Sequence, residues 1–235
     1  MKFEKIVFLM ITISICTVLI TTQLQTQDSI SVLVNNSGPY IGTAVPHDYG
    51  FDGSGIIISV IDTGVDFNHP DLLGLGLEGK IIGGYDFVDN DETPQDSNGH
   101  GTQVAGIIAA NGNLTGIAPN SKILAYRVSE DGESVSSNLI IKAIEKSISD
   151  NADIINISLG INQTNTKIDQ IVTKAIQNNI FVVTAAGNFG PEPNTIGSPG
   201  LNPNAITVGA TFNDVSSSLV STFTIDDQQF NIFPM

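Results

Sequence analysis

Between residues 56 and 210, short apolar runs alternate with amphipathic stretches, and this alternation limits the possible folds more than any other feature. The apolar runs are typical of buried strands, and the amphipathic stretches repeat their apolar residues at helical spacing. The predicted strands are Ile56–Ile61, Lys122–Val128, Ile154–Leu159, Phe181–Ala185 and Ile206–Ala210, and the predicted helices are 101–110, Ser136 or Ser137 to Ser149, and 167–178. We therefore expect an α/β fold, built from βαβ units, with a mostly parallel sheet covered on both faces.

The first 25 residues differ in character from the rest. Lys2 and Lys5 form a basic start, and the apolar run 6–20 follows it. A run of about 15 residues suits the core of a signal peptide better than a membrane span of about 20. We expect a secreted, extracellular protein; the alternative is an uncleaved membrane anchor through residues 6–20 that holds the protein facing outside. Residues 26–50 are polar and turn-rich, and we interpret them as a linker or leader arm.

The charge balance excludes one class of partner. The chain has 24 Asp and Glu residues against 9 Lys and Arg residues, a formal net charge of −15. Such a surface repels phosphate backbones, so we expect no binding to nucleic acid. The single cysteine, Cys16, lies in the N-terminal apolar run, so no disulfide is expected within the folded part. The three histidines, His47, His69 and His100, lack the paired spacing of a zinc site.

Three segments carry residues suited to chemistry. Asp62 ends a predicted strand and is followed by Thr-Gly, a tripeptide that aspartic proteases also use. His100 lies between two glycines at the head of a predicted helix, so its ring can stand clear of the backbone. Asn188 follows the strand 181–185 and Gly187; the pattern suits an ordinary turn or an amide directed at a ligand. Ligands of parallel sheets gather at the carboxyl ends of the strands, where these residues fall.

Together with Asn156-Ile157-Ser158-Leu159-Gly160, these segments resemble the subtilisin-like serine proteases, or subtilases, over roughly residues 50–211. The resemblance implies a subtilisin-like three-layer α/β/α fold and a serine endopeptidase that acts on polypeptides. It implies that Asp62 and His100 are the Asp and His of a catalytic triad and that Asn188 is the amide of an oxyanion hole. The residues implied in substrate binding are Ser158, Leu159, Gly160, Ala186 and Gly187.

The chain differs from the subtilases at the nucleophile. The Gly-Thr-Ser-Met-Ala segment that carries the serine in subtilases is absent, and Ser198, followed by Pro199, suits a turn instead. We expect residues 51–211 to be a partial, C-terminally incomplete catalytic domain, residues 212–235 to be a truncated tail or the start of an insert, and the isolated chain to be inactive. The alternatives are a non-catalytic, peptide-binding pseudoprotease and one half of a split protease, which a second chain carrying the serine would complement.

An acidic loop suggests a metal. Residues 86–95 resemble a calcium-binding loop of thermitase-like subtilases. The implied ligands are oxygens of Asp86, Asp89, Asp91 and Gln95 and the carbonyl of Thr93, which are the hard donors that Ca²⁺ prefers. We expect a structural calcium ion here; the alternative is a solvated acidic loop.

Overall fold

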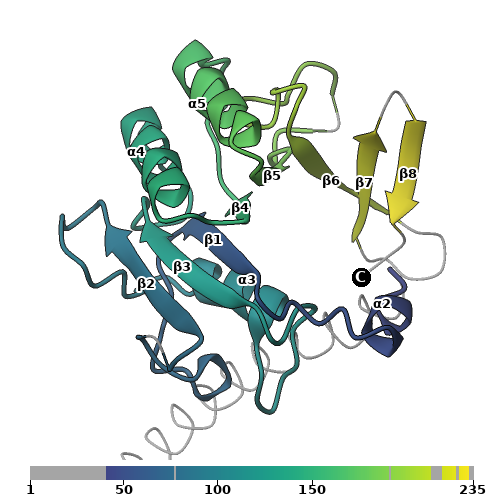
Figure 1. Ribbon diagram of the computed structural model, residues 1–235. Helices are drawn as coiled ribbons and strands as arrows, with labels where there is room; N and C mark the ends of the chain where they lie inside the picture. Colours follow the sequence, from purple (N-terminus) through teal and green to yellow (C-terminus); the bar gives the residue numbers. More distant parts are fainter. Residues whose placement is uncertain (1–40, 77, 191, 213–218, 226–227, 233–235) are drawn as a thin grey trace, which may run out of the picture.

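The structure, a computed structural model, describes residues 41–76, 78–190, 192–212, 219–225 and 228–232 (Figure 1). Its centre is an eight-stranded sheet in the order β2-β3-β1-β4-β5-β6-β7-β8. The strands are β1 (Ile57–Asp62), β2 (Ile81–Asp86), β3 (Lys122–Arg127), β4 (Ile154–Ile157), β5 (Phe181–Ala185), β6 (Ile206–Phe212), β7 (Leu219–Ile225) and β8 (Gln228–Ile232). Strands β2 to β6 of this order pair in parallel, whereas β7 and β8 extend the sheet in antiparallel pairing.

Helices cover both faces of the parallel part. The helices are α2 (Ala44–Asp48), α3 (His100–Ala109), α4 (Ser137–Ser149) and α5 (Thr166–Gln177), and a 3₁₀ turn spans Pro70–Leu72. Figure 1 shows α4 and α5 next to one another on one side of the sheet and α3 behind it. The result is a three-layer α/β/α arrangement with a mostly parallel sheet, as predicted.

Two hydrophobic clusters hold these layers together. Successive residues of a strand point to opposite faces, so Ile61 and Tyr126 pack in the cluster under α4 and α5, while Val60 and Ala125 pack in the cluster under α3. All four side chains are almost completely buried. Each large apolar side chain buried in this way stabilises the fold by about 1.5–3 kcal/mol. Burial on both faces explains why the strands are continuously apolar.

The predicted elements all form, with small differences at their ends. The five predicted strands are β1, β3, β4, β5 and β6, and the three predicted helices are α3, α4 and α5. Strand β4 ends at Ile157, two residues earlier than predicted, because Leu159 is buried in the core beyond the strand and prolongs the apolar run. Ser136 is the N-cap of α4, although its side chain makes no capping hydrogen bond.

Strand β2 was not predicted, and its glycines explain why. Gly83 and Gly84 interrupt the apolar pattern, and the pairing with β3 shifts its register between Ile81 and Gly83. A Cβ on Gly84 would lie only 1.8 Å from the carbonyl oxygen of Ala125. The glycines that weaken the strand signal in the sequence are therefore the residues that allow β2 to approach β3.

The strand order places a switch point beside β1. From β1 the chain builds β2 and β3 on one side of β1, and it then adds β4, β5 and β6 on the other side. β1 pairs with β3 through Ile57–Asp62 and with β4 through Ile58–Ile61. Crevices for ligands in open parallel sheets form outside the carboxyl ends of the strands at such a point, which is where Asp62 lies.

The N-terminal predictions fall mainly on residues 1–40, which lie outside the described residues. Residues 41–50, which belong to the predicted linker or leader arm, contain α2, and His47 Nε2 lies 2.8 Å from the Ile117 carbonyl oxygen. Among the described helices, none has both the length and the hydrophobicity that a bilayer-spanning segment needs.

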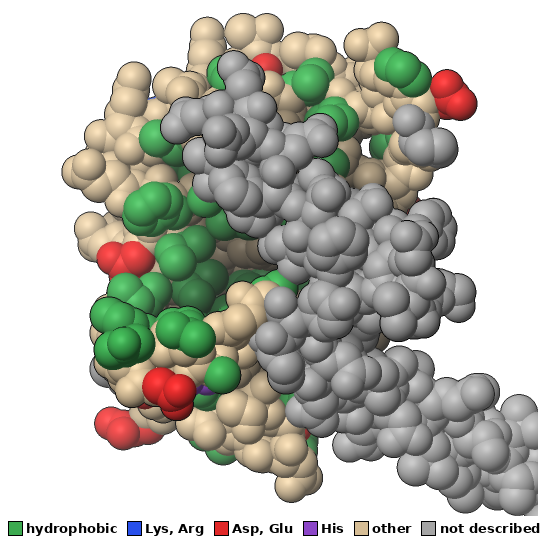
Figure 2. All heavy atoms as spheres, turned by 90° about the vertical axis from the view of Figure 1, so that its right-hand side faces the viewer, with side chains coloured by type: hydrophobic (Ala, Val, Ile, Leu, Met, Phe, Trp, Pro, Cys, Tyr) green, Lys and Arg blue, Asp and Glu red, His purple; other side chains and the backbone are tan. Residues whose placement is uncertain are grey.

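Figure 2 shows the face that lies at the right of Figure 1. Among the described residues, hydrophobic side chains gather there around a hollow, and Asp and Glu side chains stand at its edges with hardly any Lys or Arg. The acidic character of the whole sequence is thus also visible on this face.

Candidate active site

Asp62 is the last residue of β1, and its side chain is fully buried at the carboxyl edge of the sheet. Its Oδ1 accepts a hydrogen bond from the Thr63 N–H at 2.7 Å. Its Oδ2 is also buried and has no hydrogen-bond partner among the described residues. A buried carboxylate is costly unless donors compensate for its lost hydration, so Asp62 depends strongly on the groups that reach Oδ1.

The second of these groups is the ring of His100, the first residue of α3. His100 Nδ1 donates to Asp62 Oδ1 at 2.7 Å, which leaves Nε2 as the ring nitrogen available to a ligand. Gly101 makes this approach possible, because a Cβ at that position would lie 2.1 Å from the Gly64 carbonyl oxygen. The structure thus brings together the Asp and His that the two motifs singled out.

The environment of His100 makes its ring more basic. The hydrogen bond to Asp62 raises the pKa of His100 above its ordinary value of 6.5; partial burial opposes this rise, and the negative charges of Asp62 and Asp96 add to it. The ring is 45% exposed, so solvent screens part of the attraction. A histidine oriented by a carboxylate and more basic than usual is suited to accept a proton at Nε2.

Asp96 links the segments that carry Asp62 and His100, and its role was not predicted from the sequence. Its carboxylate accepts hydrogen bonds from the Thr63 hydroxyl, the amides of Asn98 and Gly99, and the amide and hydroxyl of Thr102. Burial disfavours its charge, but these hydrogen bonds hold the pKa of Asp96 below its usual range. One carboxylate therefore joins the end of β1 to the first turn of α3. An Asp shortly before a helix start is a capping signal that sequence reasoning could have used.

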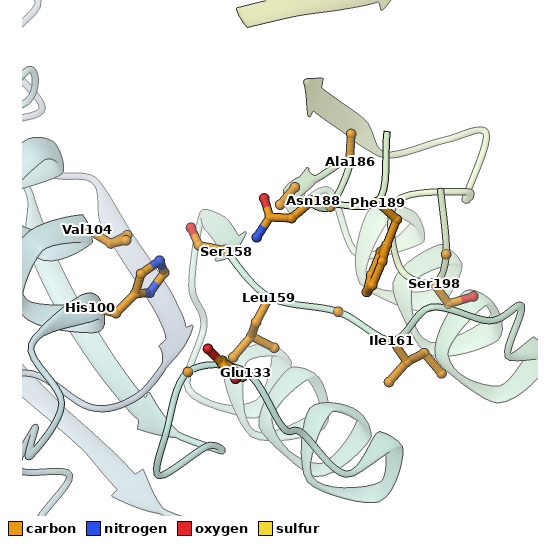
Figure 3. A pocket seen from close by; sticks show the side chains of 15 residues that line it. His100, Val104, Glu133, Ser158, Leu159, Ile161, Ala186, Asn188, Phe189 and Ser198 are labelled. Atoms are coloured by element: carbon orange, nitrogen blue, oxygen red, sulfur yellow. The ribbon is translucent and has the colours of Figure 1, made fainter. Parts of the chain in front are cut away.

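His100, the exposed member of the pair, lines a cleft of about 460 Å³ (Figure 3). Every predicted substrate-binding residue lines it: Ser158, Leu159 and Gly160 after β4, and Ala186 and Gly187 after β5. Asn188 lines it too, and Figure 3 shows its amide pointing toward the side of the cleft where His100 lies. Glu133, from the loop before α4, is a lining residue that sequence reasoning did not single out.

Ser198 contributes to this cleft without offering a nucleophile. Its side chain is buried, and its hydroxyl donates to Asp169 Oδ1 at 2.9 Å and accepts from the Asn165 N–H at 2.8 Å. These bonds engage the hydroxyl in holding the loop against α5. Among the described residues, the His100 ring makes its hydrogen bond to Asp62 and none to a serine hydroxyl.

Comparison with known proteins identifies the family. The model of the subtilase family matches residues 53–232. The chain belongs to the subtilase family. The short distance between Asp62 and His100 and the cleft beside them are therefore features of a subtilase domain.

Several subtilases are similar to this chain over most of its length. It is 41% identical to the minor extracellular protease Vpr of Bacillus subtilis (strain 168) over 79% of this chain and 24% of that protein. It is 43% identical to thermitase of Thermoactinomyces vulgaris, covering 73% of this chain and 61% of thermitase. The solved structure of sphericase matches with a TM-score of 0.62 and 35% identity, over 72% of this chain and 58% of sphericase. The chain thus spans between about a quarter and three fifths of these relatives.

The predicted calcium loop is folded around an arginine in this subtilase. Arg127 Nη1 lies 2.7 Å from Asp86 Oδ2 and 2.6 Å from Asp89 Oδ2, so its charge compensates both carboxylates. Asp91 Oδ1 accepts from the Thr93 N–H at 2.7 Å. Within the described ranges, no three His, Cys, Asp or Glu side chains converge closely enough to form a metal cluster. One oxygen of the loop, Gln95 Oε1, is buried and has no hydrogen-bond partner among the described residues.

Proposed function

We propose that this subtilase hydrolyses internal peptide bonds as a serine endopeptidase with an Asp-His-Ser triad. The observation that carries the proposal is the 2.7 Å hydrogen bond from His100 Nδ1 to the buried Asp62, at the border of a cleft that peptides can enter. Family membership supports it, because relatives such as the thermophilic serine proteinase of Bacillus sp. (strain AK1), 44% identical, are named as serine proteases.

In this mechanism His100 Nε2 takes the proton of a serine hydroxyl while the oxygen attacks the scissile carbonyl, and it then gives the proton to the leaving amine. Asp62 holds the Nδ1–H tautomer and stabilises the imidazolium that forms. Asn188 donates its amide to the oxyanion of the tetrahedral intermediate, a contact of the kind worth about 10²–10³ in turnover. That magnitude was measured for the oxyanion-hole Asn of a subtilisin and is not a value for this chain.

The substrate is proposed to bind as an added strand. Within the described residues, the backbones of Leu159 and Gly160 make no hydrogen bonds to the protein, so their donors and acceptors are available to an extended peptide. Ala186 and Gly187 are small and leave room for a substrate side chain beside that strand.

The nucleophilic serine is proposed to lie outside the described residues, either elsewhere in the gene product or on a complementing chain. This follows from the engagement of Ser198 with Asp169 and Asn165 and from the hydrogen bond of the Ser158 hydroxyl with Asn156 Nδ2 at 2.8 Å. Secretion remains a proposal as well; it is supported by the name of Vpr, which describes that relative as extracellular.

The test is hydrolysis of a quenched fluorescent polypeptide by the protein as its gene encodes it, by H100Q and by H47Q. We expect H100Q to lose at least about three orders of magnitude in rate, because the triad acts as one unit. H47Q removes an exposed histidine that does not line the cleft, and it should hydrolyse like the unaltered protein. Hydrolysis that survives H100Q contradicts the proposal. An absence of both hydrolysis and fluorophosphonate labelling also contradicts it when the chain that carries the serine is present in the assay.

A calcium ion is proposed as a structural cofactor of the loop 86–95. The unused Gln95 Oε1 supports it, since a buried oxygen without a donor suits a bound cation. The ion would be held by Asp86, Asp89, Asp91, Gln95 and the Thr93 carbonyl, and it would have to share Asp86 and Asp89 with Arg127. It would stiffen a loop that leads into Asp96 and α3.

A further inference from the structure

The loop between β3 and α4 forms one wall of the cleft. Gly132 and Glu133 line the cleft together with His100 and Leu159 (Figure 3). Resting on the proposed function, we propose that Glu133 makes this cleft selective for polypeptides that carry Lys or Arg at the position beside it. The class of substrate is therefore a cationic segment of extended polypeptide.

The loop holds Glu133 in place through its own hydrogen bonds. Asp131 Oδ1 accepts from the amides of Glu133 at 2.9 Å and Ser134 at 2.7 Å, and these bonds lower the pKa of Asp131 to about 2. The Ser129 hydroxyl accepts from the Gly132 N–H at 3.0 Å and donates to the Ser134 carbonyl at 2.7 Å. The backbone that carries Glu133 is therefore fixed at both ends of the turn.

A further bond fixes the loop relative to His100. Asn98 Nδ2 donates to the Asp131 carbonyl at 2.9 Å, and the Oδ1 of the same Asn98 side chain accepts from the His100 N–H at 3.1 Å. A Cβ on Gly132 would lie 3.4 Å from Thr63, which shows how closely the loop packs against the end of β1. The backbone at Glu133 is thus held at a fixed position relative to His100.

The charge of Glu133 is uncompensated in this position. Its carboxylate takes part in none of the ion pairs among the described residues, and no described Lys or Arg lines the cleft. Among the described residues that line the cleft, Glu133 and His100 are the two with ionisable side chains. A Lys or Arg side chain of the substrate would be attracted by the Glu133 carboxylate, and an Asp or Glu side chain would be repelled by it. The loop therefore favours cationic over anionic substrates.

The expected preference is modest because Glu133 is exposed. Ion pairs of exposed side chains correspond to a preference of up to about five-fold, and salt screens them. The net charge of −15 attracts cationic peptides in general, so a test must separate this general attraction from the local effect.

The test measures binding of fluorescein-labelled peptides by anisotropy. One Lys is moved through an otherwise neutral sequence, and each peptide is paired with its Gln counterpart. The proteins are the unaltered chain, E133Q and the matched control E130Q, which removes the same charge from the same loop outside the cleft lining. We expect one Lys position to be favoured by up to about five-fold, to lose this advantage in E133Q and to keep it in E130Q.

The preference should also shrink as sodium chloride rises from about 0.05 to 0.5 M. Equal binding of Lys and Gln peptides, a Lys preference that persists in E133Q, or no peptide binding at all overturns the proposal. A Lys preference without cleavage supports it even if the proposed hydrolysis fails. Cleavage without a Lys preference leaves the protease standing and removes the assignment of Glu133.

Discussion

Asp62 and His100 form an asymmetric pair, because the carboxylate is fully buried while the imidazole is 45% exposed. The buried partner cannot move toward solvent, so it holds the ring in one orientation. The exposed partner can exchange protons with a ligand. The Oδ1 atom of Asp62 receives both the Thr63 amide and the ring, which gives the pair a rigid geometry and a raised basicity of His100.

The pH dependence of His100 follows from this arrangement. Its pKa is raised in the folded state, so the attraction between protonated His100 and Asp62 stabilises the fold fully below pH about 6.5 and is lost as the pH rises through the raised value. An NMR titration of the three histidine rings should place His100 above 6.5, and D62N should lower its pKa. A His100 that titrates at or below the ordinary value in the unaltered protein contradicts this geometry.

At the scale of elements, the site depends on how closely α3 begins beside β1. The contact leaves no room for a side chain at Gly101, whereas an added Cβ at Gly106 in the same helix meets nothing within 4 Å. The two glycines of α3 therefore serve different purposes, and the sequence by itself does not distinguish them.

This difference gives a matched pair of variants. G101A should lower the free energy of unfolding by about 3 kcal/mol, because the methyl group forces α3 away from the Gly64 carbonyl. G106A should be neutral or stabilising by up to about 1 kcal/mol, since Ala favours helix more than Gly does. Urea unfolding measures both. Equal effects of the two substitutions would show that α3 is not packed as described.

The sequence predicted what depends on local pattern and missed what depends on distant contacts. Asp62 and His100 were singled out because each lies at the end of a predicted element close to a glycine, and because their segments together resemble the subtilases. Asp96 and Glu133 were missed because their roles arise only when the loops before α3 and α4 fold against the end of β1. Strand β2 was missed because Gly84 is required by the backbone of β3, which lies far away in the sequence.

At the scale of the molecule, the excess of acid affects stability and the attraction of charged ligands. A net charge of −15 favours cationic peptides and also destabilises the compact chain through self-repulsion. A cation bound in the loop 86–95 would relieve part of that repulsion. Calcium is therefore expected to affect the whole fold and not the loop alone.

Thermal unfolding in calcium chloride measures this effect. Calcium at about one hundred times its Kd should add about 2.7 kcal/mol, and the unfolding midpoint should rise by several degrees. D91N should abolish most of the rise, whereas E92Q, which removes the same charge from the loop outside the ligand set, should keep it. Magnesium at the same ionic strength is the control for general screening, and an equal rise in magnesium contradicts a calcium site.

The cleft is built from two parts of the chain, which meet in the sheet where β1 pairs with β4. Asp62, His100 and Glu133 are carried by the part of the chain before β4, and Ser158 to Asn188 are carried by β4, β5 and the segments that follow them. Only Ile58–Ile61 and Ile154–Ile157 join the two halves within the sheet. A slip of one residue along this seam would displace the proposed peptide-binding edge by about 3.3 Å relative to His100, further than a hydrogen bond reaches. The alignment of proton transfer with substrate is therefore set by the register of two short strands.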